Sequence, residues 1–161
     1  MSDTSNTRVL RHSVFRMSLR TEIVIDVSPK RIWEVLTDFP CYQYWNASIP
    51  QAIGEAIEGS ELNVIIKWPG MKQNPYKLKV LSAVKERELR WIGHLGKNGL
   101  MDGDHSFVIE PILDERSRLI QAEQFSGWLV PLFAPWLKRN ILCGFEQMNQ
   151  ALKNRAEGYT T

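Results

Sequence analysis

Large apolar residues recur at helical spacing near the end of the chain. Between residues 128 and 157 the intervals that separate them are four, four, three and four, the period of one face of an α-helix. This spacing predicts one long amphipathic helix whose apolar stripe consists of Leu137, Ile141, Phe145, Met148 and Leu152. Such a stripe must be buried against another layer of structure.

The residues before this helix alternate between apolar and polar side chains, as β-strands do. We expect strands at residues 21–27, 49–57, 62–68, 76–84, 89–95, 105–110 and 119–128. Two short helices are predicted after the first strand, at 29–37, where Ser28 and Pro29 form a start signal, and at 38–46. Short polar turns between strands favour an antiparallel meander. The pattern therefore predicts an α+β fold, in which a curved antiparallel sheet of about seven strands and the long helix enclose an apolar pocket.

The composition is that of an ordinary globular domain. The chain has 161 residues, of which 43% are apolar and 24% are charged. A net charge of +2 and the absence of a long basic run argue against a nucleic-acid partner. Cys41 and Cys143 lie in unrelated segments and are expected to be reduced, and the three histidines have no metal-ligand spacing. We therefore expect neither a metal nor a cofactor.

The beginning of the chain mixes arginine with apolar residues. Arginines at 8, 11, 16 and 20 interrupt every apolar stretch, unlike a secretory signal, so a cytoplasmic location is expected. No run approaches the ~18 apolar residues of a membrane span, so stable membrane insertion is not expected. We expect residues 1–16 to be a flexible extension, 17–157 one ligand-binding domain and 158–161 a tail. Within the extension, residues 8–16 suit an extra strand, a short surface helix or an arm in weak contact with anionic lipid.

Four segments carry a family resemblance: TEIVIDVSPKRIWEVLTDFPCYQYWN, ELRWIGHLGKNGLMDGDHSFVIEP, EQFSGWLVPLF and GFEQMNQALKNRAE. On these motifs the chain, over residues 20–157, resembles the SRPBCC or START-like superfamily, and within it the bacterial polyketide cyclase/dehydrase and lipid-transport-like proteins. The resemblance implies the helix-grip fold, in which the sheet wraps around the C-terminal helix. It also implies a cavity for a hydrophobic molecule. Ala47 stands where relatives often carry proline, which affects only the conformation of a loop.

Strand alternation selects the side chains that face the pocket. Matching the apolar faces of neighbouring strands turns His105, Gln121 and Glu123 inward, and a buried carboxyl group needs a partner such as His105. The alternative is a satisfied polar cluster at the cavity mouth or sheet edge. The opposite parity of His94 predicts an exposed side chain. The expected ligand-binding residues are Trp68, Tyr76, Trp91, His105, Phe107, Gln121, Glu123, Phe125, Ile141, Phe145 and Met148.

Three classes of function fit these features. The first is a carrier or sensor of a small hydrophobic, lipid-like or polyketide-like molecule. The second is a polyketide cyclase, aromatase or dehydratase that uses His105 and Glu123 as its acid–base pair. The third is a regulatory interaction module without a ligand. The chain has no G-x-S-x-G, H-E-x-x-H or dinucleotide-binding glycine motif, which favours binding over catalysis. We expect a monomer or a homodimer.

Overall fold

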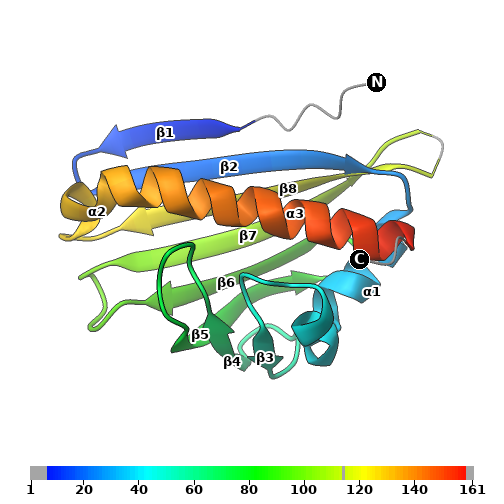
Figure 1. Cartoon of the computed structure of the whole chain (residues 1–161), viewed down its shortest axis with the longest axis horizontal. Helices are drawn as coiled ribbons and strands as arrows, with labels where there is room; N and C mark the ends of the chain where they lie inside the picture. The colour runs from blue at the N-terminus through cyan, green and yellow to red at the C-terminus, as the bar shows by residue number, and fades with distance from the viewer. Residues whose placement is uncertain (1–6, 114, 159–161) are drawn as a thin grey trace.

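One antiparallel sheet with a long helix lying across one face makes up the domain in a computed structural model, which describes residues 7–113 and 115–158 (Figure 1). The strand order is β1-β2-β8-β7-β6-β5-β4-β3. The strands are β1 Arg8–Ser13, β2 Arg16–Ile25, β3 Gln51–Ile53, β4 Glu61–Ile66, β5 Asn74–Val84, β6 Glu88–His94, β7 Asp102–Pro111 and β8 Ser117–Ser126. The helices are α1 Pro29–Thr37, the 3₁₀-helix Phe39–Tyr44, α2 Val130–Trp136, a π-helical segment Leu137–Ile141 and α3 Leu142–Glu157. This arrangement confirms the predicted helix-grip fold.

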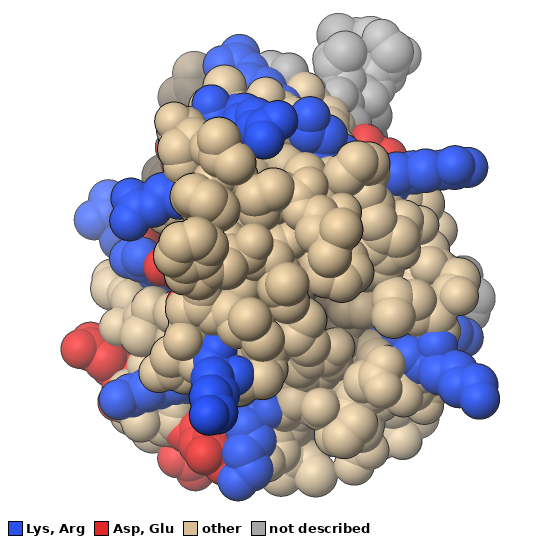
Figure 2. Space-filling model, turned by 90° about the vertical axis from the view of Figure 1, so that its left-hand side faces the viewer, with Lys and Arg blue, Asp and Glu red and all other residues tan. Residues whose placement is uncertain are grey.

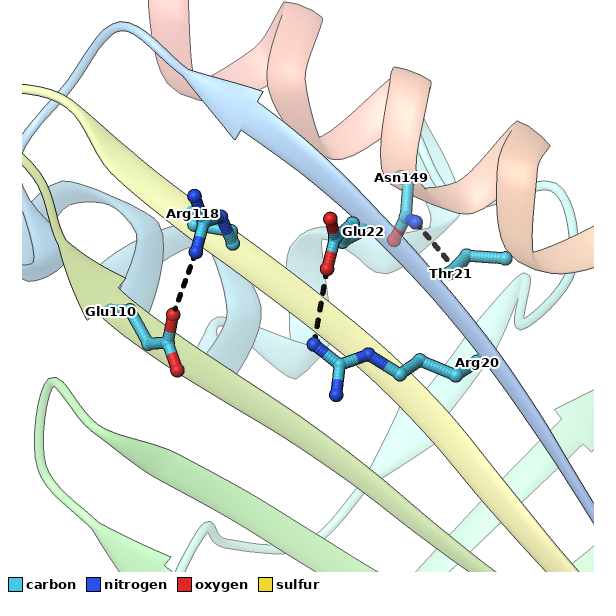
Figure 3. A network of polar contacts seen from close by, with 6 residues as sticks. All are labelled: Arg20, Thr21, Glu22, Glu110, Arg118 and Asn149. Atoms are coloured by element: carbon cyan, nitrogen blue, oxygen red, sulfur yellow. Dashed lines mark hydrogen bonds and ion pairs between the residues drawn. The ribbon is translucent and has the colours of Figure 1, made fainter. Parts of the chain in front are cut away.

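The alternation of side chains along β2 separates the two faces of the sheet. Thr21 is buried and its Oγ1 accepts a hydrogen bond from Asn149 Nδ2 of α3, at 2.9 Å. Arg20 and Glu22, its neighbours in sequence, pair with each other on the opposite face at 3.0 Å (Figure 3). The period of two therefore turns one face toward the helix and leaves the other to charged residues.

Polar bonds fix the C-terminal half of α3 to the end of β2. The Lys153 ammonium group donates to the backbone carbonyl of Val24 at 2.8 Å, and it pairs with Glu157 at 3.0 Å. The Glu157 carboxylate also accepts from the backbone N–H of Asp26 at 2.7 Å. Gly158 then ends the helix with a left-handed φ of 84°. This end of the helix is held close to the sheet.

The predicted long helix is present but is not continuous. It begins at Val130, with Pro131 in its first turn, and Pro135 lies inside α2. Proline has no N–H to donate to the carbonyl four residues earlier, and its ring crowds that carbonyl. A π-helical segment over Leu137–Ile141 follows directly and carries the chain into α3. The helix predicted between residues 128 and 157 is therefore present from Val130, and its regular spacing is broken by this π-helical segment.

Two strands change the expected sheet of about seven strands. The sheet has an additional strand because Arg8–Ser13 pairs with β2 as an edge strand, which is one of the three alternatives expected for residues 8–16; residues 1–6 lie outside the described residues. The strand expected at 49–57 is reduced to Gln51–Ile53. The Asn46 side chain accepts from the backbone N–H groups of Ser48 and Ile49, which turns the chain before the strand. Gly54, at a φ of 141°, ends it.

Two apolar clusters fill the space between the sheet and the helices. The larger cluster joins α1 and the C-terminal part of α3 to the sheet and includes Leu36, Leu119 and Leu152. The smaller cluster joins the start of β2 and the end of β8 to the helix and includes Met17, Phe125 and Leu137. Within the described ranges, no helix is long and apolar enough to cross a bilayer.

Candidate ligand-binding cavity

A cavity of about 420 Å³ lies between the sheet and the helices, where the two apolar clusters meet. This volume falls in the range of about 300–1,000 Å³ that is usual for small-molecule sites. The helices contribute Phe133, Trp136, Leu137, Ile141, Gly144, Phe145 and Met148. The strands and loops contribute Ser48, Ile49, Ile66, Trp68, Met71, Tyr76, Leu78, Trp91, Gly93, His94, Leu95, Met101, Gly103, His105, Gln121, Glu123 and Phe125.

Two glycines hollow the inner surface of the sheet at this place. Gly93 of β6 and Gly103 of β7 are partners in the antiparallel register. A Cβ at Gly93 would lie 2.7 Å from a methyl carbon of Leu78, and a Cβ at Gly103 would lie 2.5 Å from Glu123 Oε1. Both distances are too short for a side chain without movement of the neighbour. The missing side chains therefore leave room for the cavity and for the Glu123 carboxyl group.

Three buried polar side chains form the floor of the cavity. His105 and Glu123 are register partners on β7 and β8, and Gln121 precedes Glu123 on the same face of β8. Gln121 Nε2 lies 3.1 Å from His105 Nε2, a distance that suits donation by the amide to an unprotonated ring nitrogen. Gln121 Nε2 also contacts Met148 Sδ at 3.6 Å. The proton of a neutral His105 is then on Nδ1, which faces Glu123 Oε2 at 3.8 Å.

Burial makes both ionisable groups of the floor neutral near pH 7. Removal from water raises the pKa of Glu123 to about 8, and the nearby Asp104 raises it further. Removal from water lowers the pKa of His105 to about 3, against the opposing effect of Asp104. The contact between Glu123 and His105 is therefore one between a carboxylic acid and a neutral imidazole.

Two buried oxygen atoms of the floor have no hydrogen-bond partner among the described residues. They are Gln121 Oε1 and Glu123 Oε2. An unpaired buried polar atom costs about 1–3 kcal/mol, so a ligand group that bonds to it gains that amount. An amide oxygen accepts, and a protonated carboxyl group both donates and accepts. A hydroxyl group on a ligand matches this pair.

The cavity reaches the surface beside α2. Met71, in the loop between β4 and β5, and Leu95, after β6, line the cavity and are also exposed. Trp68 and Trp136 meet here edge to face, with ring centroids 6.3 Å apart. The interrupted helix places Trp136, Leu137 and Ile141 on the wall of the cavity.

All of the residues expected to bind a ligand line the cavity except Phe107. Phe107 has the inward parity, but it lies deeper along β7, where the rings of Trp91 and His105 cover it at centroid distances of 5.2 and 4.6 Å. His94, expected to be exposed, is half-buried because its Nδ1 lies 2.6 Å from Asp102 Oδ1.

Several lining residues were missed by the sequence interpretation. The loop residues Met71 and Met101 have no periodicity that would reveal them. Trp136 directly precedes Leu137, the first residue of the helical stripe, and this position could have identified it as a lining residue. Within residues 7–113 and 115–158, no group of three or more histidine, cysteine or acidic side chains is placed to hold a metal ion.

Comparison with known proteins identifies the family and the fold. The family model described as polyketide cyclase / dehydrase and lipid transport matches residues 16–157. No curated protein matches the chain. A START superfamily protein from Mycobacterium smegmatis is similar in structure, with a TM-score of 0.73 and 18% identity over 89% of this chain and 99% of that one.

Two enzymes share this fold at low sequence identity. The Zhui aromatase/cyclase from Streptomyces sp. R1128 has a TM-score of 0.71 and 16% identity, over 88% of this chain and 94% of that one. Norcoclaurine synthase from Thalictrum flavum, in complex with dopamine and hydroxybenzaldehyde, has a TM-score of 0.69 and 13% identity, over 91% and 89% of the two chains. At these identities the likeness concerns the fold alone.

Proposed function

This chain belongs to the polyketide cyclase / dehydrase and lipid transport family, and we propose that it binds one small hydrophobic molecule in the cavity, as a carrier or sensor. The observation that carries the proposal is the cavity of about 420 Å³, whose walls are mainly aliphatic, aromatic and methionine side chains. Such walls fit flat or flexible apolar molecules of varied shape. A cavity of this volume also argues against an interaction module whose interior is filled.

The floor adds a requirement for one polar group on the ligand. Gln121 Oε1 and Glu123 Oε2 are unpartnered within the described residues, and both Glu123 and His105 are neutral near pH 7. An anionic or cationic ligand group finds no counter-charge there, and its desolvation opposes binding. We infer an uncharged ligand that is largely apolar and carries a hydroxyl group at the end that enters first.

Native mass spectrometry of freshly purified protein tests the proposal directly. We expect a bound species whose mass identifies an uncharged apolar compound. In addition, the apolar dye phenylnaphthylamine should bind in the cavity, and naphthol should displace it better than methylnaphthalene, which has the same shape without the hydroxyl group. Absence of any bound species together with absence of dye binding would overturn the proposal.

A cyclase or dehydratase function is the second candidate, because Glu123 is a buried carboxylic acid in a shaped cavity. With a pKa of about 8 it can donate a proton to a leaving hydroxyl group, which departs as water and leaves the Glu123 carboxylate. The partner is less suitable. His105, with a pKa of about 3, is a weak base at neutral pH, and Gln121 occupies its unprotonated nitrogen. Binding therefore remains the first candidate.

Substitution of Glu123 separates the two candidates. Glu123→Gln keeps a neutral side chain of the same shape but cannot donate an acidic proton. A carrier would retain its affinity in this variant, whereas an enzyme would retain its affinity and lose turnover. Glu123→Leu removes the hydrogen bonding of this side chain and leaves Gln121 Oε1 in place, and it serves as the matched variant. It should reduce the preference for naphthol over methylnaphthalene in both cases.

A further inference from the structure

Three connecting segments meet at the end of the sheet where the cavity opens. They are the β1–β2 turn at residues 14–15, the β6–β7 loop at 95–101 and the β8–α2 link at 127–129. The N–H of Gly127 donates to the carbonyl of Phe15 at 3.1 Å, and the N–H of Leu129 donates to that of Leu100 at 3.0 Å. The rings of Phe15 and Trp128 are 4.9 Å apart. These bonds join the three segments into one surface.

This surface presents large apolar side chains to solvent. Trp128 and Leu132 are 75% and 72% exposed, although such side chains are usually covered. Met71 and Leu95 extend the surface to the cavity, which they also line. We call the set the mouth patch; its members are Val14, Phe15, Met71, Leu95, Leu100, Trp128 and Leu132.

Basic residues surround the mouth patch. Figure 2 shows this end of the molecule, with uncharged surface across its centre, bordered by lysine and arginine side chains and by fewer acidic ones. Arg16, Lys72 and Lys97 are adjacent or close in sequence to patch residues, and Lys138 and Arg139 follow α2. Among the described residues, none of these five forms an ion pair. The nearby carboxylate of Asp102 is engaged by His94 and by the N–H of Gly99.

We propose that the mouth patch docks the protein on an anionic phospholipid bilayer, with the cavity opening against the membrane. Exposed tryptophan and leucine side chains enter the boundary between headgroups and acyl chains, and the surrounding cations bind acidic headgroups. A second copy of the chain suits the patch less, because it would bring two rims of positive charge together. The proposal rests on surface residues and holds whatever the cavity contains.

Vesicle flotation tests the proposal with the full chain. We expect binding to vesicles of phosphatidylcholine mixed with phosphatidylglycerol, weaker binding to phosphatidylcholine alone, and loss of the difference at high salt. Leu132→Asn should reduce partitioning about tenfold, the loss expected for one leucine side chain that leaves an apolar environment. Leu113→Asn is the matched control, because Leu113 is 80% exposed between β7 and β8, outside the patch, and should leave partitioning unchanged.

A second pair of variants tests the charged rim. Lys97→Glu should weaken binding to anionic vesicles at least fivefold and leave binding to neutral vesicles unchanged. Lys85→Glu, in the β5–β6 turn at the opposite end of the sheet, should have no effect. Equal behaviour of Leu132→Asn and Leu113→Asn, or absence of wild-type binding to anionic vesicles, would overturn the proposal. The proposal would also be overturned if the wild-type protein did not bind vesicles but self-associated, and if Leu132→Asn abolished this self-association. The patch would then be the contact surface for a second copy of the chain.

Discussion

Gly103 and Glu123 are diagonal neighbours on β7 and β8, so close that a Cβ at position 103 would lie 2.5 Å from Glu123 Oε1. The missing side chain is what allows a carboxyl group to lie on the floor of an apolar cavity. Gly103 is not one of the residues with a left-handed φ. Alanine is therefore acceptable to the backbone, and the carboxyl group rather than the strand must move.

The first prediction follows from this contact. In Gly103→Ala the Glu123 carboxyl group is displaced, so the preference of the cavity for naphthol over methylnaphthalene should fall about fivefold, the value of one hydrogen bond. Competition against phenylnaphthylamine measures it. Gly93→Ala is the control, because its methyl group meets only Leu78 and reduces the volume without contacting Glu123. Equal loss of preference in both variants would show that volume alone is responsible.

The second prediction concerns stability at alkaline pH. Folded Glu123 holds its proton up to a pKa of about 8, whereas the unfolded chain releases it near 4.5, so folding takes up a proton between these values. The free energy of unfolding therefore falls as pH rises through this window, by at most ~1.4 kcal/mol per pH unit. His105 acts in the opposite sense, because its pKa is about 3 when folded and near 6.5 when unfolded.

The two pH dependences offset each other between 4.5 and 6.5, and only that of Glu123 remains from 6.5 to about 8. Urea unfolding over this upper interval should show wild-type stability falling with pH. Glu123→Gln, which has no proton to release, should remove most of the fall. Parallel profiles for the two proteins would contradict burial of Glu123 as an acid.

The third prediction concerns the buried hydrogen bond between Asn149 of α3 and Thr21 of β2. Thr21→Val keeps the shape of the side chain but removes the acceptor of the buried Asn149 amide (Figure 3). We expect a loss of about 1–3 kcal/mol, because the amide is left unpaired. Adding Asn149→Leu should recover much of the loss, since the double variant buries no unpaired donor. Urea unfolding of the four proteins forms the double-mutant cycle, and strictly additive losses would show that the bond contributes nothing.

The fourth prediction concerns the wall of the cavity. The Phe145 ring packs on His105 with centroids 4.9 Å apart. Phe145→Ala enlarges the cavity and removes this cover, so phenylnaphthylamine should bind about tenfold more weakly. Tyr44→Ala, at an exposed aromatic residue that does not line the cavity, is the control and should bind the dye as the wild type does. Unchanged dye affinity in Phe145→Ala would place the dye elsewhere.

The alternation of inward and outward side chains along the strands allowed most of the site residues to be predicted from the sequence. The period of two placed His105 and Glu123 on the inner face, where the structure has them. The alternation of side chains shows which face of the sheet a residue is on, but not whether the cavity extends to that point of the strand. Phe107 therefore has the inward orientation without lining the cavity. The hollow itself depends on Gly93 and Gly103 being register partners, and the register across the β6–β7 loop is not visible in the alternation within either strand.

The helix illustrates a different limit. Apolar spacing identified the stripe from Leu137 to Leu152, because a buried face imposes its period on the sequence. Whether the helix kinks at Pro135 or takes up an additional residue depends on the packing around it, which local spacing does not encode. The exposed residues of the mouth patch come from separate loops, so no single segment of sequence carries them together.

The π-helical segment at Leu137–Ile141 has a consequence for how this protein diverges from its relatives. A π turn is an α-helix that holds one extra residue. Because the wider turn absorbs the extra residue, deletion of a single codon there would restore the regular helix with little rotation of α2 relative to α3. Phe133 and Trp136 would keep facing the cavity, and the sheet and Phe145 would stay in place. Leu137–Ile141 is thus a place where the chain can lose one residue while the cavity wall is kept.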